Sequence, residues 1–375
     1  MPRFPAWRRT DFHVPGGAPP VRFVTLDAMR GIAAISVMFF HYLFHNPYHL
    51  FYQAFYAVDF FFCLSGAILT HSYEKKIIAG MRFREYAERR MIRFYPLYLL
   101  GFFFGSAMLV MYAKSGTIVD FTIRDYVLSE ILNAFFLPYP NAGISPFFTG
   151  GTINGVIFPV DVPAWSLFFE LLASAALFFA LRWRIRPGYI VIISLPLLGG
   201  SLLFFRSANL GWGTDTFIAG FSRTAFAFFG GVVLYRLYLR MRLAGSVRPW
   251  GLLIGAAIAF ALPLWGLVGL LFFSVFIPAL IFLGLMSEDH VKGRIFENLG
   301  RLSYGIYVLH WPIYQLLVIV LSRSALSEDG GPTSVAVIAS IVTIFLAYVL
   351  TKFIDEPARR WLSRRLIVKG APMAA

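Results

Sequence analysis

Residues 26–34 read LDAMRGIAA, and the apolar run around them continues to His41. An arginine and a histidine therefore lie inside a stretch that has the composition of a membrane-spanning helix. Ionisable side chains are costly in a bilayer, so they usually face the interior of a helix bundle and serve a function. Eleven residues at ~100° each give about three full turns and a rise of ~16 Å. Arg30 and His41 are thus predicted to share one stripe of one helix, with Arg30 near one membrane surface and His41 at or beyond the midplane.

The whole chain has the composition of a polytopic membrane protein. It is 58% hydrophobic and only 14% charged, whereas soluble domains have about 25% charged residues. Its single cysteine excludes an intramolecular disulfide bond. The first 24 residues contain proline, glycine and arginine but no apolar core, so they are interpreted as a cytosolic tail and not as a cleavable signal peptide.

Ten apolar segments each have about the 17–25 residues that a bilayer core requires, and they predict an all-α transmembrane bundle. They lie near 25–45, 50–71, 94–113, 162–181, 188–205, 217–235, 251–266, 267–286, 302–322 and 333–351. With ten spans both termini share one side of the membrane.

Basic residues then orient the bundle. Of the 33 lysine and arginine residues, 27 would lie on the side of the termini and four on the other. Lysine and arginine are enriched in cytoplasmic loops, so both termini are predicted to be cytoplasmic. The expected division is a basic tail over 1–24, a transmembrane domain over 25–354 and a second basic tail over 355–375. This distribution also explains the net charge of +14 without a nucleic-acid partner.

One long outer segment, 114–160, interrupts the pattern of short loops. Between Thr122 and Leu137 its apolar residues recur with helical spacing, which predicts an interfacial or re-entrant helix. The stretch that follows is rich in proline and glycine and runs into Trp165 and Glu170. A long loop without structure of its own is usually functional or disordered, and this position favours a function.

Polar groups within or beside the spans are the candidate site residues. They are Asp27, Arg30, His41, Asp59, Ser65, Glu170, Arg223, Ser303, Tyr304, Tyr307, His310 and Glu356. A buried histidine beside acidic groups is a candidate general base at neutral pH. Arg90 and Arg93, three residues apart on a cytoplasmic helix face, could bind phosphates through forked hydrogen bonds.

Structural interpretations of several of these residues stay open. Asp27 could cap the first helix, and Ser65 with Gly66 could allow two helices to approach. Tyr304 and Tyr307 could be interfacial aromatic residues, and His310 could bond a carbonyl group near Pro312. The chain has no His-Glu-x-x-His or Cys-x-x-Cys spacing, no nucleotide-binding glycine loop and no Gly-x-Ser-x-Gly elbow. No metal site is predicted.

Taken in order, these segments resemble the acyltransferase 3 family of integral membrane O-acyltransferases, from about residue 23 to residue 360. The resemblance is carried by the Arg30-x10-His41 spacing, Asp59-Phe60-Phe61-Phe62 with Leu64-Ser65-Gly66, Arg90-x-x-Arg93 with Pro96 and Tyr98, Trp165-Ser166-Leu167 with Glu170, the run from Ser303 to His310, and Glu356-Pro357. Where many members read Glu-Gln-Phe-Tyr after the glutamate, this chain reads Leu171-Leu172-Ala173-Ser174. Many members also carry an extracytoplasmic hydrolase-like domain, and this chain, ending at Ala375, would be the stand-alone form.

The resemblance implies transfer of an acyl group, commonly acetyl, from cytoplasmic acyl-CoA to a hydroxyl of a glycan or lipid-linked glycan. It implies no bound cofactor, with acyl-CoA as co-substrate, and a bacterial inner-membrane location. By this resemblance Arg30 and His41 correspond to the family's essential pair of residues. Arg90 and Arg93 correspond to the residues that bind the acyl donor, and Arg30 and Ser65 are further candidates for donor binding.

The mechanism expected from this comparison has His41 take the proton of the acceptor hydroxyl. Glu170 or Asp59 would orient His41, and the outer segment 114–160 would bind the acceptor. Two other classes remain open, a transporter of a polysaccharide precursor or small molecule and a non-catalytic assembly partner. The sequence makes no prediction of the oligomeric state.

Overall fold

A computed structural model describes residues 23–43, 48–115, 122–140, 155–241, 247–287, 293–321 and 333–367. Parts of the predicted tails, 1–22 and 368–375, lie outside these ranges. The proline- and glycine-rich residues 141–154 of the outer segment also lie outside them. Everything that follows concerns the described residues.

The described chain is built of helices. In order they are α1 (Val24–Tyr42), α2 (Tyr56–Ile78), α3 (Phe83–Ser115), α4 (Ile123–Ala134), the short 3₁₀ helix η1 (Val162–Ala164), α5 (Trp165–Arg182), α6 (Pro187–Phe205), α7 (Phe217–Met241), α8 (Pro249–Ala261), α9 (Gly266–Met286), α10 (Arg294–Leu321), α11 (Thr333–Leu350), a π-helical turn (Thr351–Asp355), α12 (Glu356–Leu362) and a second π-helical turn (Ser363–Ile367).

Eight helices of the described chain are long and apolar enough to cross a membrane. The shorter apolar helix α8 and the 23-residue helix α2 occupy the positions of the other two predicted spans. The predicted polytopic helical bundle is confirmed. Helix α4 lies within the outer stretch for which the apolar spacing predicts a helix.

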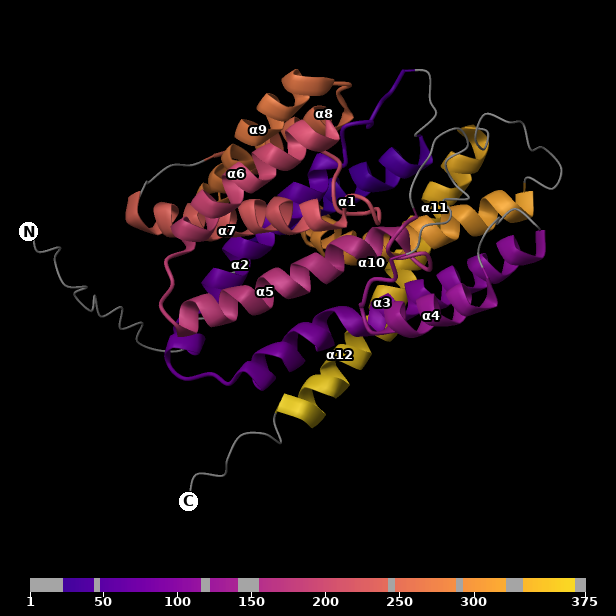
Figure 1. The fold of residues 1–375 in the computed structure, drawn as a ribbon, viewed down its shortest axis with the longest axis horizontal. Helices are drawn as coiled ribbons and strands as arrows, with labels where there is room; N and C mark the ends of the chain where they lie inside the picture. Colours follow the sequence, from indigo (N-terminus) through magenta and orange to yellow (C-terminus); the bar gives the residue numbers. More distant parts are fainter. Residues whose placement is uncertain are drawn as a thin grey trace, which may run out of the picture.

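The bundle is organised around α10, which packs against α1, α3 and α11 (Figure 1). Every residue from Ser303 to Gln315 on α10 is buried. A helix that is buried all round belongs to the core of its bundle. In Figure 1, α8 and α9 lie on the opposite side of the molecule from α3 and α4. The polar residues Ser303 and His310 of α10 are therefore inside the bundle.

Helices α2 and α7 touch through glycine. A Cβ atom at Gly66 would lie 1.9 Å from the Phe228 carbonyl oxygen, and one at Gly231 would lie 1.8 Å from the Cys63 carbonyl oxygen. The two backbones are thus in reciprocal contact. Small residues allow such close packing within a membrane, where no hydrophobic force draws helices together.

Helix α4 covers the outer part of α3 and leaves an apolar stripe uncovered. Ile123, Val127, Ile131 and Phe135 are all exposed, at helical spacing along one side. On the opposite side Asn133 is buried, and its carbonyl oxygen accepts a hydrogen bond from Tyr98 at 2.6 Å. This amphipathic arrangement suits a helix that lies in the membrane interface.

The α2–α7 contact predicts different effects at two adjacent glycines. Gly231→Ala should destabilise the protein by about 1–3 kcal/mol, because the added methyl group overlaps backbone atoms that cannot move independently. Gly230→Ala is the matched control, since a Cβ at Gly230 meets nothing within 4 Å, and alanine favours a helix over glycine by up to ~1 kcal/mol. The thermal transition in detergent measures both. Equal transitions for the two variants would contradict the proposed backbone contact.

Candidate functional site

Arg30 is held on the inner part of the α1–α10 contact. Its Nε donates to Ser303 Oγ at 2.9 Å, and one Nη donates to the Gly300 carbonyl oxygen at 3.0 Å. The same guanidinium forms an ion pair with Asp27 at 3.2 Å, one turn earlier on α1. Asp27 therefore pairs with the span's own arginine, and Ser303 is a direct partner of that arginine.

His41 lies further out on α1 and contacts a second histidine. Its Nδ1 is 3.0 Å from the Val37 carbonyl oxygen and 3.0 Å from Nε2 of His310 on α10. His310 Nδ1 is in turn 3.1 Å from the Ile306 carbonyl oxygen. Arg30 and His41 thus both face α10, as the shared stripe on α1 predicts.

These contacts assign one protonation pattern to the histidine pair. A carbonyl oxygen only accepts hydrogen bonds, so each Nδ1 that faces one carries a proton. Neutral His310 then has a lone pair on Nε2, which accepts from His41 Nδ1–H. Neutral His41 keeps its own lone pair on Nε2. This is the atom that a general base uses.

His41 lines a cavity of about 630 Å³, here called the outer cavity because His41 lies at the end of α1 that the sequence predicts to face outward. Its wall is rich in aromatic side chains and carries a few polar ones, including Tyr52, Gln53, Trp165, Arg206, Asn209, Trp212, Trp265, Tyr307 and Trp311. Ligand sites are commonly apolar hollows with a few placed polar groups. The described part of the outer segment 114–160 does not line this cavity. The prediction that this segment binds the acceptor therefore rests on residues 116–121 and 141–154, which lie outside the described ranges.

A second cavity, of about 330 Å³, lies at the end of the bundle where α1 and α3 begin. We call it the inner cavity. It is lined by four arginines, Arg30, Arg89, Arg90 and Arg93, and by a single acidic residue, Glu170. Arg89 pairs with Glu85 and Arg90 with Glu170. Among the described residues Arg93 has no ion pair. Arg30 is paired with Asp27, so Arg93 leaves the inner cavity with a net positive charge.

Neither carboxylate proposed to orient His41 contacts it. Glu170 accepts hydrogen bonds from Arg90 and from Ser65, each at 2.7 Å, in the inner cavity. Asp59 is held by Arg223 through two bonds of 2.8 Å. His310 is the partner of His41 instead. The physical reason is that α10 lies against α1 at this depth, whereas Glu170 on α5 faces α2 and α3.

The remaining candidates divide between the two cavities. Tyr304 lines the inner cavity and donates to the Phe94 carbonyl oxygen at 2.7 Å. Tyr307 Oη is 2.6 Å from Ser166 Oγ and donates to the Pro163 carbonyl oxygen at 3.2 Å. Trp165, next to Ser166, lines the outer cavity and stacks beneath the Arg223 guanidinium. The sequence motif around Trp165 thus forms part of both walls.

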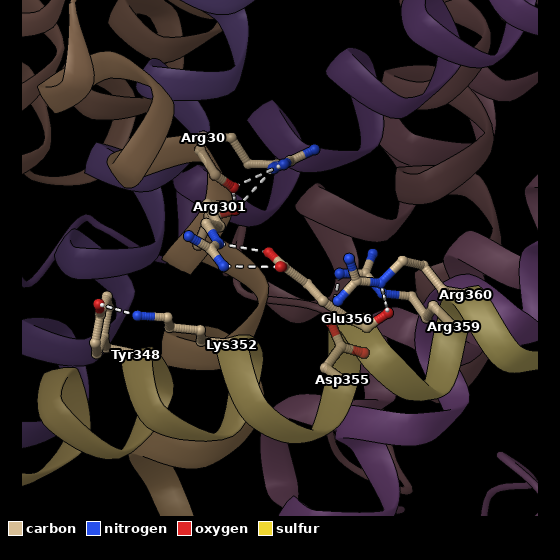
Figure 2. A network of polar contacts seen from close by, with 10 residues as sticks. Arg30, Arg301, Tyr348, Lys352, Asp355, Glu356, Arg359 and Arg360 are labelled. Carbon is tan, nitrogen blue, oxygen red and sulfur yellow. Dashed lines mark hydrogen bonds and ion pairs between the residues drawn. The ribbon is translucent and has the colours of Figure 1, made fainter.

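Glu356 belongs to a charged network that joins α10 to α12 and the π-helical turn before it (Figure 2). Arg301 donates to both oxygens of Glu356, and Arg359 forms an ion pair with Asp355. Arg30 lies next to this network in Figure 2. Arg301 and Asp355 were not among the predicted site residues, although Asp355 directly precedes the Glu356 motif.

Asp161 is a buried acid that the sequence analysis did not single out. It is 1% exposed, and neither of its carboxyl oxygens has a hydrogen-bond partner among the described residues. It lies just before the span that begins at Val162. Burial raises the pKa of Asp161 well above its usual range. Burial therefore favours the protonated, uncharged form of this side chain.

This raised pKa predicts a pH-dependent stability. The folded protein holds a proton on Asp161 that the unfolded chain releases, so this group's stabilising effect is present below the ordinary aspartate pKa and is lost as the pH rises toward the folded pKa. The Asp161→Asn variant keeps the shape of the side chain but has no carboxyl group to titrate. The decline in thermal transition between pH 5 and pH 8 should be smaller in this variant than in wild type. Identical slopes in the two proteins would contradict the buried neutral acid.

Comparison with known proteins places this arrangement in a family. A family model described as an acyltransferase domain matches residues 23–352. The protein is 34% identical over 180 residues, which are 45% of this chain and 86% of the relative, to protein 2 in the picA locus of Rhizobium radiobacter. No solved structure matches.

Two further relatives extend over most of the chain. The exopolysaccharide production protein ExoZ of Rhizobium meliloti is 25% identical over 336 residues, covering 85% of this chain and 94% of ExoZ. A putative peptidoglycan O-acetyltransferase of Bacillus subtilis, YrhL, is 26% identical over 384 aligned positions. That match covers 92% of this chain and 56% of YrhL, so this chain spans about half the length of that relative.

Proposed function

The chain belongs to the acyltransferase 3 family, and from that premise we propose that it transfers an acyl group from cytoplasmic acyl-CoA to a hydroxyl of a glycan or lipid-linked glycan. It is a multi-pass membrane acyltransferase. The relatives named for exopolysaccharide production and peptidoglycan O-acetylation support a glycan acceptor and an acetyl donor. We further propose the bacterial inner membrane as its location.

The observation that carries this proposal is the pairing of a basic inner cavity with a histidine in an outer one. Arg93 forms no direct ion pair among the described residues, and Arg30 shares its cavity. Arginine is well suited to phosphate, because its planar group presents two parallel donors. The phosphates of acyl-CoA would therefore bind at the inner cavity, and the pantetheine arm would extend outward between the helices.

The outer cavity would take the acceptor. Its tryptophan and tyrosine rings offer flat faces against which a sugar ring can pack, and Gln53 and Asn209 offer amide groups to sugar hydroxyls. The cavity has room for an acceptor beside His41. A pocket that combines apolar faces with a few polar groups fixes both the position and the orientation of a ligand.

His41 would act as the general base. Its Nε2 takes the proton of the acceptor hydroxyl, whose oxygen attacks the thioester carbonyl carbon. The carbon–sulfur bond breaks, and the proton passes to the leaving thiolate as free CoA forms. While His41 is charged, its Nδ1–H donates to the Val37 carbonyl oxygen and to His310, so the imidazolium remains bonded. A carrier protein would not require this base.

His41→Ala should lower turnover by ~10²–10⁴, the usual contribution of a general base. The measurement is release of CoA thiol from acetyl-CoA by the protein in nanodiscs. The acceptor is the native host's surface glycan, stripped of esters by base. His71→Asn is the matched control, because His71 contacts Tyr235 and lines neither cavity. More than a tenth of wild-type turnover in His41→Ala would exclude the base role.

Arg93→Ala should raise the KM for acetyl-CoA about tenfold or more, because a charge-assisted bond to phosphate contributes ~1.5–3 kcal/mol. The same variant should use acetyl-pantetheine, which lacks the nucleotide phosphates, as well as wild type does. Arg84→Ala is the control, since Arg84 is exposed and paired with Glu88. An unchanged KM for acetyl-CoA in Arg93→Ala would remove the phosphate site.

An assay in proteoliposomes distinguishes the acyltransferase function from the alternative function as a transporter. Proteoliposomes that release CoA thiol only when acceptor glycan is present support the acyltransferase. Movement of labelled glycan across the membrane without any acyl donor would instead favour a carrier.

A further inference from the structure

The two cavities meet at one residue. Among the described residues Tyr307 alone lines both of them. The segment 163–166 beside Tyr307 also contributes to both cavities. Ser166 lines the inner cavity, whereas Pro163 and Trp165 line the outer one. Phe61, which lines the inner cavity, packs edge-on against the Tyr307 ring with centroids 5.3 Å apart. The Tyr307 side chain is therefore the wall between the donor and acceptor sides.

The hydroxyl of Tyr307 belongs to a small group in which two hydroxyls share a single carbonyl acceptor. Tyr307 Oη and Ser166 Oγ are 2.6 Å apart, and each can donate to the Pro163 carbonyl oxygen, at 3.2 and 3.1 Å. If Ser166 donates to Pro163, Tyr307 donates to Ser166 Oγ, and the Tyr307 proton can exchange that bond for one to another acceptor. Redirecting it would leave the Pro163 carbonyl bonded, so the cost of an unsatisfied buried group is avoided.

We propose that Tyr307 is a catalytic residue of the transfer, whose hydroxyl binds the thioester carbonyl oxygen at the junction of the two cavities. This proposal rests on the function proposed above. A thioester held from the inner cavity reaches an acceptor in the outer cavity only beside this side chain. His41 lies on the outer side of the same junction, because its ring lines the outer cavity that Tyr307 also lines.

The chemistry needs a donor at this place. When the acceptor oxygen attacks, negative charge moves onto the thioester carbonyl oxygen, and the acceptor proton goes to His41 Nε2. The Tyr307 hydroxyl stabilises that oxygen by a hydrogen bond and keeps its own proton. The carbonyl then re-forms as the carbon–sulfur bond breaks, giving an ester and free CoA. No oxidant or further reactant is required.

The first test compares two phenylalanine variants on the same helix. Tyr307→Phe should lower kcat by ~10²–10³ with little change in the KM for acetyl-CoA, the effect of removing one oxyanion donor. Tyr314→Phe is the matched control, because Tyr314 lies on the same helix, lines neither cavity and stacks on the Tyr42 ring with centroids 4.5 Å apart. It should leave kcat within about threefold of wild type, a change worth less than ~1 kcal/mol. Both assays use acetyl-CoA and the de-esterified host glycan.

Ser166→Ala completes the series. Here Tyr307 must serve the Pro163 carbonyl by itself, so kcat should fall, but less than in Tyr307→Phe. A kcat for Tyr307→Phe equal to that of Tyr314→Phe would overturn the proposal while His41→Ala still reports on the proposed function. A fall in the thermal transition of Tyr307→Phe that matches its loss of activity would also count against a catalytic role.

A second experiment, thiol labelling, tests whether Tyr307 separates the two cavities, and it requires no acyl transfer. In a Cys63→Ala background, Ser65→Cys places one thiol on the inner cavity. A membrane-impermeant methanethiosulfonate should label it from the cytoplasmic side only, and Tyr307→Ala should admit the reagent from the outer side as well. Outer labelling with Tyr307 intact, or none in Tyr307→Ala, would overturn the assignment of Tyr307 as the wall. This outcome is independent of whether the protein transfers acyl groups.

Discussion

The polar seam between α1 and α10 is the interaction on which the rest of the structure depends. At its inner end Arg30 bonds Ser303 and the Gly300 carbonyl oxygen, and further out His41 bonds His310. Beside them the Tyr42 hydroxyl donates to the His310 carbonyl oxygen at 2.8 Å. Isolated in lipid, each of these groups would be costly. Pairing these groups offsets the free-energy cost of burying them. It also fixes how the two helices are rotated and shifted along their axes relative to each other.

The seam also explains why the site has two compartments. Arg30 and His41 belong to one helix but open onto different cavities, because α10 crosses between them and brings Tyr307 to the wall. The arginines line the inner cavity, whereas the histidine lines the outer cavity among aromatic side chains. Among the described residues the two cavities share Tyr307 alone.

Buried ion pairs support this arrangement from the flanks. Arg223 joins α7 to Asp59 on α2, and Arg90 joins α3 to Glu170 on α5. Removing one member of such a pair would leave an uncompensated charge, which is far more costly than the pair itself is stabilising. Glu170 and Asp59 therefore act on the site through the arginines and helices that they hold, and not through the histidine.

The sequence by itself determined the class of fold, the positions of the helices and the shared stripe of Arg30 and His41, because these follow from apolar length and helical period within one segment. It also identified Arg93, Tyr307 and His310 as residues to examine. Only the tertiary structure decided the partners: His310 for His41, Arg90 for Glu170, Arg223 for Asp59, and Tyr307 for the wall. Partners on different helices depend on how each helix is rotated and how deeply it lies against its neighbour. Those quantities arise from packing between segments far apart in the chain, as the close contact of Gly66 and Gly231 with facing backbones shows, and no local pattern encodes them.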